Sequence, residues 1–227
     1  MTEPIKLYIG SDEASLRAEK ALISSVERNC SGEIDLVVMR AGDLNWRRWG
    51  MQPSHPNHSA FDCGMKMWMN RYSCFRFAVP ELQGFQGRAI YLDVDTIVLA
   101  DLRELLAIAP SNKAWVPAYA FNTAVSVINC DQFDWDWWVS IEWMKSSDWC
   151  VEDYVAHLAR NNQIGMGPWV DWNCIDGKGY NDQTRLIHYS NQLKKIWKPW
   201  PDRFDYKDDL REIDHVWLEY DKAIQSR

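Results

Sequence analysis

Apolar and polar residues follow one another along the chain in blocks that predict an alternation of strands and helices. Residues 6–10 form a short apolar run, residues 14–29 have apolar side chains at helical spacing, and residues 34–39 form a second apolar run. A strand, a helix and a strand in this order are the opening of an α/β nucleotide-binding unit. The pattern therefore predicts an α/β fold.

The later blocks continue this alternation. Glycine, proline and asparagine are frequent in residues 41–64, which predicts a long surface loop, and residues 65–78 have a helical spacing that we expect to end at Pro80. A third strand is expected over residues 88–101. Beyond it we expect a helix N-capped by Asp101, strands at 115–119 and 124–128, helices at 133–144 and 150–160, an irregular segment at 164–173, a strand at 185–189 and a helix at 208–224.

The organisation of the chain favours one domain. Its 227 residues can bury one sizeable core, and no internal repeat, low-complexity segment or interdomain linker interrupts them. We expect a single domain over residues 1–227, with residues 200–227 forming a helical tail packed on it.

Composition and charge narrow the class of protein. Apolar residues make up 47% and charged residues 25%, as in ordinary globular proteins, and the formal net charge of −7 argues against general affinity for nucleic acid. There is no run of 18 apolar residues, and the N-terminus lacks a long apolar region with a basic start. We therefore expect no nucleic-acid partner, no membrane span and a soluble, cytoplasmic protein.

Cysteine and tryptophan usage add two further points. The six cysteines are scattered and contain no Cys-x-x-Cys pair, which favours buried free thiols over disulfides or a zinc site. The fourteen tryptophans are unusual, and this side chain can stack on sugars as well as fill a core. The tryptophans are thus compatible with carbohydrate binding without establishing it.

Two carboxylates, Asp93 and Asp95, lie among branched and aromatic residues in the third predicted strand, RAIYLDVDTIVLAD. Side chains two apart on a strand share a face, about 7 Å apart, and two unpaired carboxylates that close repel each other. A divalent cation removes this conflict, and oxygen ligands favour Mg²⁺ or Mn²⁺ bridging two phosphates. Near the carboxyl end of a strand the pair would suit a nucleotide diphosphate. Alternatively, one Asp caps the following turn and the other is solvated.

Several short motifs accompany the two aspartates. They are YIGSD at 8–12, FRFAVP at 75–80, YLDVDT at 91–96, FNTAV at 121–125, WN at 172–173, HY at 188–189 and KPW at 198–200. In their order and spacing they resemble glycosyltransferase family 8, the glycogenin and bacterial galactosyltransferase-like enzymes of GT-A fold. The resemblance covers about residues 5–200. It implies one GT-A (Rossmann-like) domain with a mixed, mainly parallel sheet flanked by helices.

The resemblance also implies an activity. Enzymes of this family move a hexose, here glucose or galactose, from a UDP-sugar to a carbohydrate acceptor with retention at the anomeric carbon, and they depend on Mn²⁺, with Mg²⁺ as a possible substitute. Carried over by position, Asp93, Asp95 and His188 would bind the metal, and Asp93 would also lie near the ribose. Two carboxylates, one imidazole and two phosphate oxygens make a sensible coordination shell.

The remaining site residues are carried over in the same way. Tyr8, Gly10, Ser11, Asp12, Arg76 and Val94 would line the donor. Asp12 would accept a hydrogen bond from the uracil N3–H, although it could instead cap the following helix. Arg76 would face the diphosphate or the donor sugar, or else form a surface ion pair. Asn122 would hydrogen-bond the donor sugar or the acceptor, unless its bond is structural.

The chain departs from the family pattern at two places. Where the family has Asp-Gln-Asp beside the donor sugar, this chain has Val151, Glu152 and Asp153, so Glu152 could stabilise or attack the anomeric carbon. After His188, Lys194 keeps the spacing of the family's lysine and Lys198 keeps its Lys-Pro-Trp context, and we favour Lys198 at the diphosphate. The alternatives are a haloacid-dehalogenase-like phosphatase and a non-catalytic sugar-nucleotide or glycan-binding domain.

Overall fold

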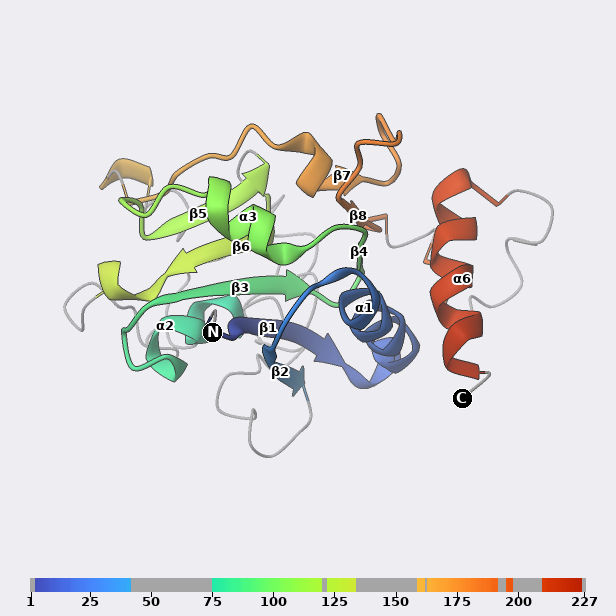
Figure 1. Cartoon of the computed structure of the whole chain (residues 1–227), viewed down its shortest axis with the longest axis horizontal. Coiled ribbons are helices and arrows are strands. Elements are labelled where there is room, and N and C mark those ends of the chain that lie inside the picture. The colour runs from blue at the N-terminus through green and yellow to red at the C-terminus, as the bar shows by residue number, and fades with distance from the viewer. Residues whose placement is uncertain are drawn as a thin grey trace, which may run out of the picture.

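The structure is a computed structural model, and it describes residues 3–41, 75–119, 122–133, 159–161, 163–191, 195–197 and 210–225. The large sheet contains β1 (Ile5–Asp12), β2 (Ile34–Ala41), β3 (Arg88–Asp93), β5 (Trp115–Tyr119) and β6 (Asn122–Asn129). The strand order is β2-β1-β3-β6-β5 (Figure 1). β2, β1 and β3 pair in parallel, whereas β6 is antiparallel to both β3 and β5. Only β6 is reversed, which confirms the predicted mixed, mainly parallel sheet.

A second, smaller sheet continues the chain beyond β3. It contains β4 (Thr96–Val98), β8 (Leu186–His188) and β7 (Cys174–Ile175), in the order β4-β8-β7. β4 is antiparallel to β8, with Thr96 opposite His188, and β7 is parallel to β8. The small sheet therefore brings residues from the last quarter of the chain beside the turn that follows β3.

The single strand expected over residues 88–101 is wrong, because the chain turns at Val94 and Asp95 between the two sheets. Two hydrogen bonds, one local and one to another strand, account for the turn. Thr96 Oγ1 donates to the Asp93 carbonyl at 2.9 Å, and the Val94 N–H donates to the Gly10 carbonyl at 3.1 Å. A side chain that bonds to the nearby backbone in this way competes with a continuous strand.

Two long helices lie beside one end of the large sheet (Figure 1). α1 (Leu16–Asn29) follows the 3₁₀ turn η1 (Glu13–Ser15), and α6 (Glu212–Gln225) packs on α1. The Arg17 guanidinium donates to both Asp221 oxygens, at 2.8 and 2.5 Å, and Asn29 Nδ2 donates to the Tyr220 hydroxyl at 2.8 Å. The predicted terminal helix is thus present and fixed to the first helix.

The short helices test two expectations about where helices begin and end. Asp101 accepts from the Arg103 N–H at 3.0 Å at the start of α3 (Leu102–Ile108), which confirms the predicted N-cap. Pro80 does not end a helix. It lies in the first turn of α2 (Val79–Leu82), directly after the 3₁₀ turn η3 (Phe75–Ala78). Proline is tolerated there because the first helical residues need no N–H donor.

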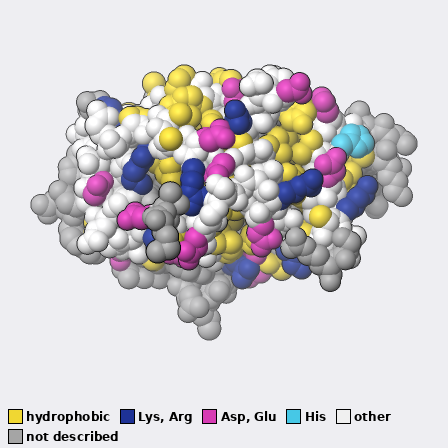
Figure 2. All heavy atoms as spheres, in the orientation of Figure 1, with side chains coloured by type: hydrophobic (Ala, Val, Ile, Leu, Met, Phe, Trp, Pro, Cys, Tyr) yellow, Lys and Arg dark blue, Asp and Glu magenta, His cyan; other side chains and the backbone are white. Residues whose placement is uncertain are grey.

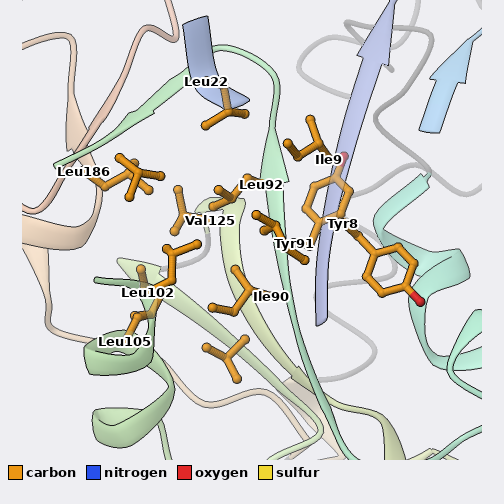
Figure 3. Close-up of a cluster of buried hydrophobic side chains, with 14 of the residues drawn as sticks. Tyr8, Ile9, Leu22, Ile90, Tyr91, Leu92, Leu102, Leu105, Val125 and Leu186 are labelled. Atoms are coloured by element: carbon orange, nitrogen blue, oxygen red, sulfur yellow. The ribbon is translucent and has the colours of Figure 1, made fainter. Parts of the chain in front are cut away.

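The core lies between the large sheet and the elements that cover it. Figure 3 shows side chains from both sheets, α1 and α3 pointing toward one another. Ile9, Leu22, Leu92, Leu105 and Leu186 are each at most 1% exposed. β1 and β3 are buried along almost their whole length, as the near-continuous apolar sequence of central parallel strands predicts.

Other expectations concern the remaining segments and the surface. Most of the expected loop at 41–64, most of the helix at 65–78 and most of the helices at 133–144 and 150–160 lie outside the described residues. Cys30, Cys130 and Cys174 are free thiols, and the latter two are buried. None of the described helices is long and apolar enough to span a membrane. Basic and acidic side chains are interspersed over the face seen in Figure 2.

Candidate active site

The candidate site lies at the carboxyl ends of β1 and β3, where the large sheet meets the small one. Gly10 pairs with Asp93 across the two strands, so Ser11 and Asp12 lie beside the turn that carries Asp95. Ligands of open α/β sheets bind at this edge. The expected position of the two aspartates at a strand end is confirmed.

Asp93 is held by a buried arginine. Arg76 Nη2 lies 2.8 Å from each carboxylate oxygen of Asp93, and the Tyr91 hydroxyl donates to one of them at 2.8 Å. Arg76 also donates to Thr123 Oγ1, and its guanidinium carbon lies 5.1 Å from the centre of the Tyr91 ring. The Arg76 ion pair is therefore buried, not on the surface. Burial raises the pKa of the Asp93 carboxyl, and the charge of Arg76 opposes that rise.

Asp95 is paired with a lysine that the sequence analysis missed. Lys195 Nζ lies 2.5 Å from Asp95 Oδ2, and Lys195 is only 1% exposed. Burial raises the pKa of Asp95, but the charge and the hydrogen bond of Lys195 hold that pKa below its usual range. The predicted candidates Lys194 and Lys198 lie outside the described residues. One signal was available, because Lys195 directly follows Lys194, which keeps the spacing of the family's lysine.

His188 joins Asp95 from the small sheet. Its Nε2 lies 3.6 Å from Asp95 Oδ1, and its Nδ1 lies 3.1 Å from Asn173 Oδ1. Asn173 Nδ2 donates to Asn122 Oδ1 at 3.2 Å, and the Ala124 N–H donates to the same oxygen at 3.1 Å. Asn122 therefore makes the structural bonds foreseen as an alternative, and Asn173 connects it to His188.

The donor atoms of this site suit a hard divalent cation in part. Asp95 Oδ1 is buried and has no hydrogen-bond partner within the described residues. Its distance from His188 Nε2 is too long for a hydrogen bond, but two atoms each about 2.1 Å from one ion are about 3–4 Å apart. Asp93 faces Arg76 instead, and the described residues contain no group of three His, Cys, Asp or Glu side chains placed to hold a metal. Asp95 and His188 thus fit the expected ion, while the three-residue centre is not confirmed.

The end of β1 contributes further polar atoms. Ser11 Oγ and Asp12 Oδ1 are buried without a hydrogen-bond partner among the described residues, and Asp12 makes no side-chain cap to η1. The helix-cap alternative for Asp12 is therefore wrong. The Tyr8 hydroxyl accepts from Gln83 Nε2 at 2.6 Å, so this side chain is engaged with the end of α2. Glu152 and Asp153 lie outside the described residues.

Solved structures of GT-A glycosyltransferases have a fold similar to that of this chain. Galactosyltransferase LgtC, solved with donor and acceptor sugar analogues, is similar over 96% of this chain and 96% of its own, with a TM-score of 0.63 and 14% identity. GlyE, a glycosyltransferase in Streptococcus pneumoniae, is similar over 96% of this chain and 61% of its own, with a TM-score of 0.61 and 16% identity. At these identities the likeness establishes the fold.

Other comparisons cover less of the proteins concerned. The bifunctional glycosyltransferase WbbM is similar over 85% of this chain, with a TM-score of 0.59 and 18% identity. Protein CDI of Arabidopsis thaliana is 25% identical over 108 residues, which are 45% of this chain. The matched parts are 46% of WbbM and 36% of CDI, so the chain corresponds to less than half of either protein. No protein-family model matches the sequence.

Proposed function

We propose that the protein is a Mn²⁺-dependent, retaining glycosyltransferase that moves glucose or galactose from a UDP-sugar to a carbohydrate acceptor. The observation that carries this proposal is the buried cluster of Asp93, Asp95, His188, Arg76 and Lys195 at the edge where the two sheets meet, in a chain with the GT-A fold. Anionic and cationic groups that alternate in a buried site are suited to a metal and a diphosphate together.

Each part of the site has a proposed role toward the donor. Ser11 and Asp12 offer unpaired oxygens to the nucleoside at the end of β1. The backbone around Gly10 and Val94, joined by the 3.1 Å hydrogen bond between them, fixes the floor of the donor site. Arg76 holds Asp93 in one orientation through its two contacts with the carboxylate. These residues would orient the donor before any bond breaks.

The departing diphosphate needs positive charge. In this proposal Asp95 and His188, with Asp93, would hold Mn²⁺, and the ion would supply positive charge toward the leaving UDP. Lys195 supplies a second cation, because its ammonium group already lies in the site on Asp95. We therefore propose Lys195 beside Lys194 and Lys198 as a candidate for the phosphate-binding lysine.

The residues proposed for the acceptor side of the reaction come mainly from the sequence motifs. We propose that Glu152 and Asp153 lie beside the donor sugar and that Asn122, which is half-buried, borders the same space. We further propose that residues 1–227 form one GT-A domain with residues 200–227 as its helical tail, and the packing of α6 on α1 supports this organisation.

One alternative retains a specific observation in its favour. Because Arg76 pairs with Asp93 and Lys195 pairs with Asp95, the site does not need a metal to balance these two charges and could serve a sugar-nucleotide-binding module that does not catalyse transfer. The phosphatase alternative loses support. Its nucleophile would be Asp93, both of whose oxygens accept from Arg76, and the fold is that of glycosyltransferases.

A donor-panel assay of UDP release tests the proposal. UDP-glucose, UDP-galactose and other UDP-sugars are incubated with the protein and Mn²⁺, with and without EDTA, beside D95N and the surface control D131N. We expect slow UDP release from one donor that EDTA and D95N abolish and D131N leaves intact. Donor binding without release, even with a panel of glycan acceptors present, would support the binding module. Release of phosphate from a generic monoester would support the phosphatase.

A further inference from the structure

Three side chains, the half-buried Asn122 and the buried Asn173 and His188, form a continuous line from the large sheet to the candidate metal ligand in the small sheet. Asn122 begins β6, Asn173 directly precedes β7, and His188 ends β8. Asn173 and His188 are 2% and 4% exposed. Each contact along this line has a donor and an acceptor that can be assigned in turn, starting from the backbone.

The assignment begins at Asn122, whose amide faces a backbone N–H. The Ala124 N–H, at 3.1 Å, can only donate, so the facing atom of Asn122 must be its oxygen, Oδ1. That oxygen can only accept. The second group that faces it, at 3.2 Å, must therefore be the NH₂ group of Asn173.

The orientation of Asn173 then decides the state of the histidine. With its NH₂ group directed at Asn122, Asn173 presents Oδ1 to His188 Nδ1 at 3.1 Å. An amide oxygen only accepts, so the proton of this bond resides on Nδ1. In an uncharged imidazole the lone pair is then on Nε2, which faces the unpaired Oδ1 of Asp95 at 3.6 Å. Two lone pairs facing each other across that gap are suited to a shared cation.

We propose that Asn173, itself oriented by Asn122, is a positioning residue that holds His188 in the Nδ1–H tautomer, with the Nε2 lone pair directed at the space beside Asp95. This inference deepens the proposed function, since the histidine is then ready to bind a divalent cation without first moving a proton. Asn173 acts only through His188 and contacts neither the donor nor the metal. An outer partner of this kind is worth about 10–100-fold in metal affinity.

The tautomer can be read directly in the metal-free protein. The full chain, labelled with ¹⁵N in histidine and freed of metal with EDTA, gives imidazole nitrogen shifts that separate N–H nitrogens from lone-pair nitrogens, and H188Q identifies the signals of His188. We expect a single Nδ1–H tautomer in the wild type. Under conditions in which the imidazole is uncharged, a predominant Nε2–H tautomer would overturn the proposal.

Matched variants separate positioning from general support of the fold. N173L removes the acceptor and should abolish the single-tautomer spectrum. N129S changes another buried asparagine, at the opposite end of β6, and should leave the His188 signals unchanged. If N173L retains the single Nδ1–H tautomer, or N129S loses it as readily as N173L, then Asn173 has no positioning role.

Binding of Mn²⁺ alone, followed by electron paramagnetic resonance, distinguishes this inference from the proposed function. We expect N173L to weaken Mn²⁺ binding about 10–100-fold, and H188Q to weaken it at least as much. If H188Q weakens binding and N173L does not, the positioning role is wrong. If neither variant changes Mn²⁺ binding while the tautomer is as expected, the positioning role of Asn173 is supported and the proposed metal site is wrong.

Discussion

Lys195 Nζ lies 2.5 Å from Asp95 Oδ2, and both side chains are at least nine-tenths buried. The ammonium group thus occupies one oxygen of the aspartate that is expected to bind a metal, while the other oxygen of Asp95 stays unpaired toward His188. Lys195 and a divalent cation therefore compete for the negative charge of the same carboxylate, and a diphosphate would relieve that competition by giving the lysine another partner.

Removal of Lys195 tests this competition. We expect K195M to raise the affinity of the ligand-free protein for Mn²⁺ by at least about tenfold, because one nearby unit charge at an effective dielectric constant of about 20 is worth more than about 1.4 kcal/mol. We expect the same variant to lower the rate of transfer, since a cation that faces the leaving group is lost. Isothermal titration with Mn²⁺ and a UDP-release assay measure the two effects. The exposed K178M is the control, and an unchanged or weaker Mn²⁺ affinity in K195M would contradict the expectation.

The buried pair of Arg76 and Asp93 should support the fold as well as the site. R76M leaves a buried carboxylate without its cation, which typically costs about 3–5 kcal/mol in the free energy of unfolding. Urea denaturation measures the loss. R185M serves as the control, because the Arg185 ion pair with Glu104 is exposed and at 3.1 Å should contribute at most about 1 kcal/mol. Equal losses in the two variants would mean that burial does not set the strength of the Arg76 pair.

An aromatic contact chain joins the C-terminal helix to the site. Trp217 on α6 stacks on Trp197 with ring centres 5.6 Å apart, and Trp197 meets Tyr189 edge-on at 5.8 Å. W217A should lower the free energy of unfolding by about 3–5 kcal/mol and raise KM for the donor, because Trp197 fixes the segment that carries Lys195. Thermal melting and donor titration measure both. Trp169 is half-buried, so W169A should lower the free energy of unfolding by less than W217A does. A W217A protein with wild-type stability would show that α6 is not part of the core.

Glu152 is a prediction from the sequence alone. If its carboxylate stabilises or attacks the anomeric carbon, E152Q should lower kcat by about 100-fold or more while KM for the donor changes little. The exposed D182N provides the comparison under the same conditions. A transfer rate within a few-fold of wild type in E152Q would remove Glu152 as a nucleophile and leave assistance by the leaving phosphate as the explanation for the proposed retention.

The thiol of Cys130 should be inert in the folded protein. Burial raises the pKa of Cys130 to about 12, so at pH 8 its reactive thiolate form is scarcely populated. We expect no alkylation of Cys130 by iodoacetamide at pH 8 in the native protein and complete alkylation in urea, with mass spectrometry of peptides as the measurement. Rapid modification of the native protein at this residue would show that the end of β6 opens readily.

The fold was predictable wherever a buried element is encoded by a continuous local pattern. The predicted ranges for β1, α1 and β2 agree with the structure to within about two residues, because apolar runs and helical spacing are local signals. The break between β3 and β4 could not be predicted, since it depends on the hydrogen bond of Val94 to Gly10 on another strand. A contact between residues far apart in sequence leaves no trace in the local pattern.

The candidate site shows the same division. Asp93, Asp95 and His188 could be found because two carboxylates in an apolar strand are conspicuous and the surrounding motifs resemble a known family. The partners of these residues could not. Lys195 lies 100 residues from Asp95 in sequence, and one of three nearby lysines had to be chosen without knowing which one points inward. Asn173 lies in the WN motif at 172–173, but its proposed role depends on its contacts with Asn122 and His188.

The turn at Val94 and Asp95 places the candidate site across the boundary between the two sheets, with Asp93 and Arg76 on one side and Asp95 and His188 on the other. A molecule that contacts both sides would link the two sheets. Because it binds only the folded chain, its binding would raise the free energy of unfolding. The abundance of the protein in a cell would then follow the concentration of this ligand, because the ligand-free chain unfolds more often and is degraded sooner.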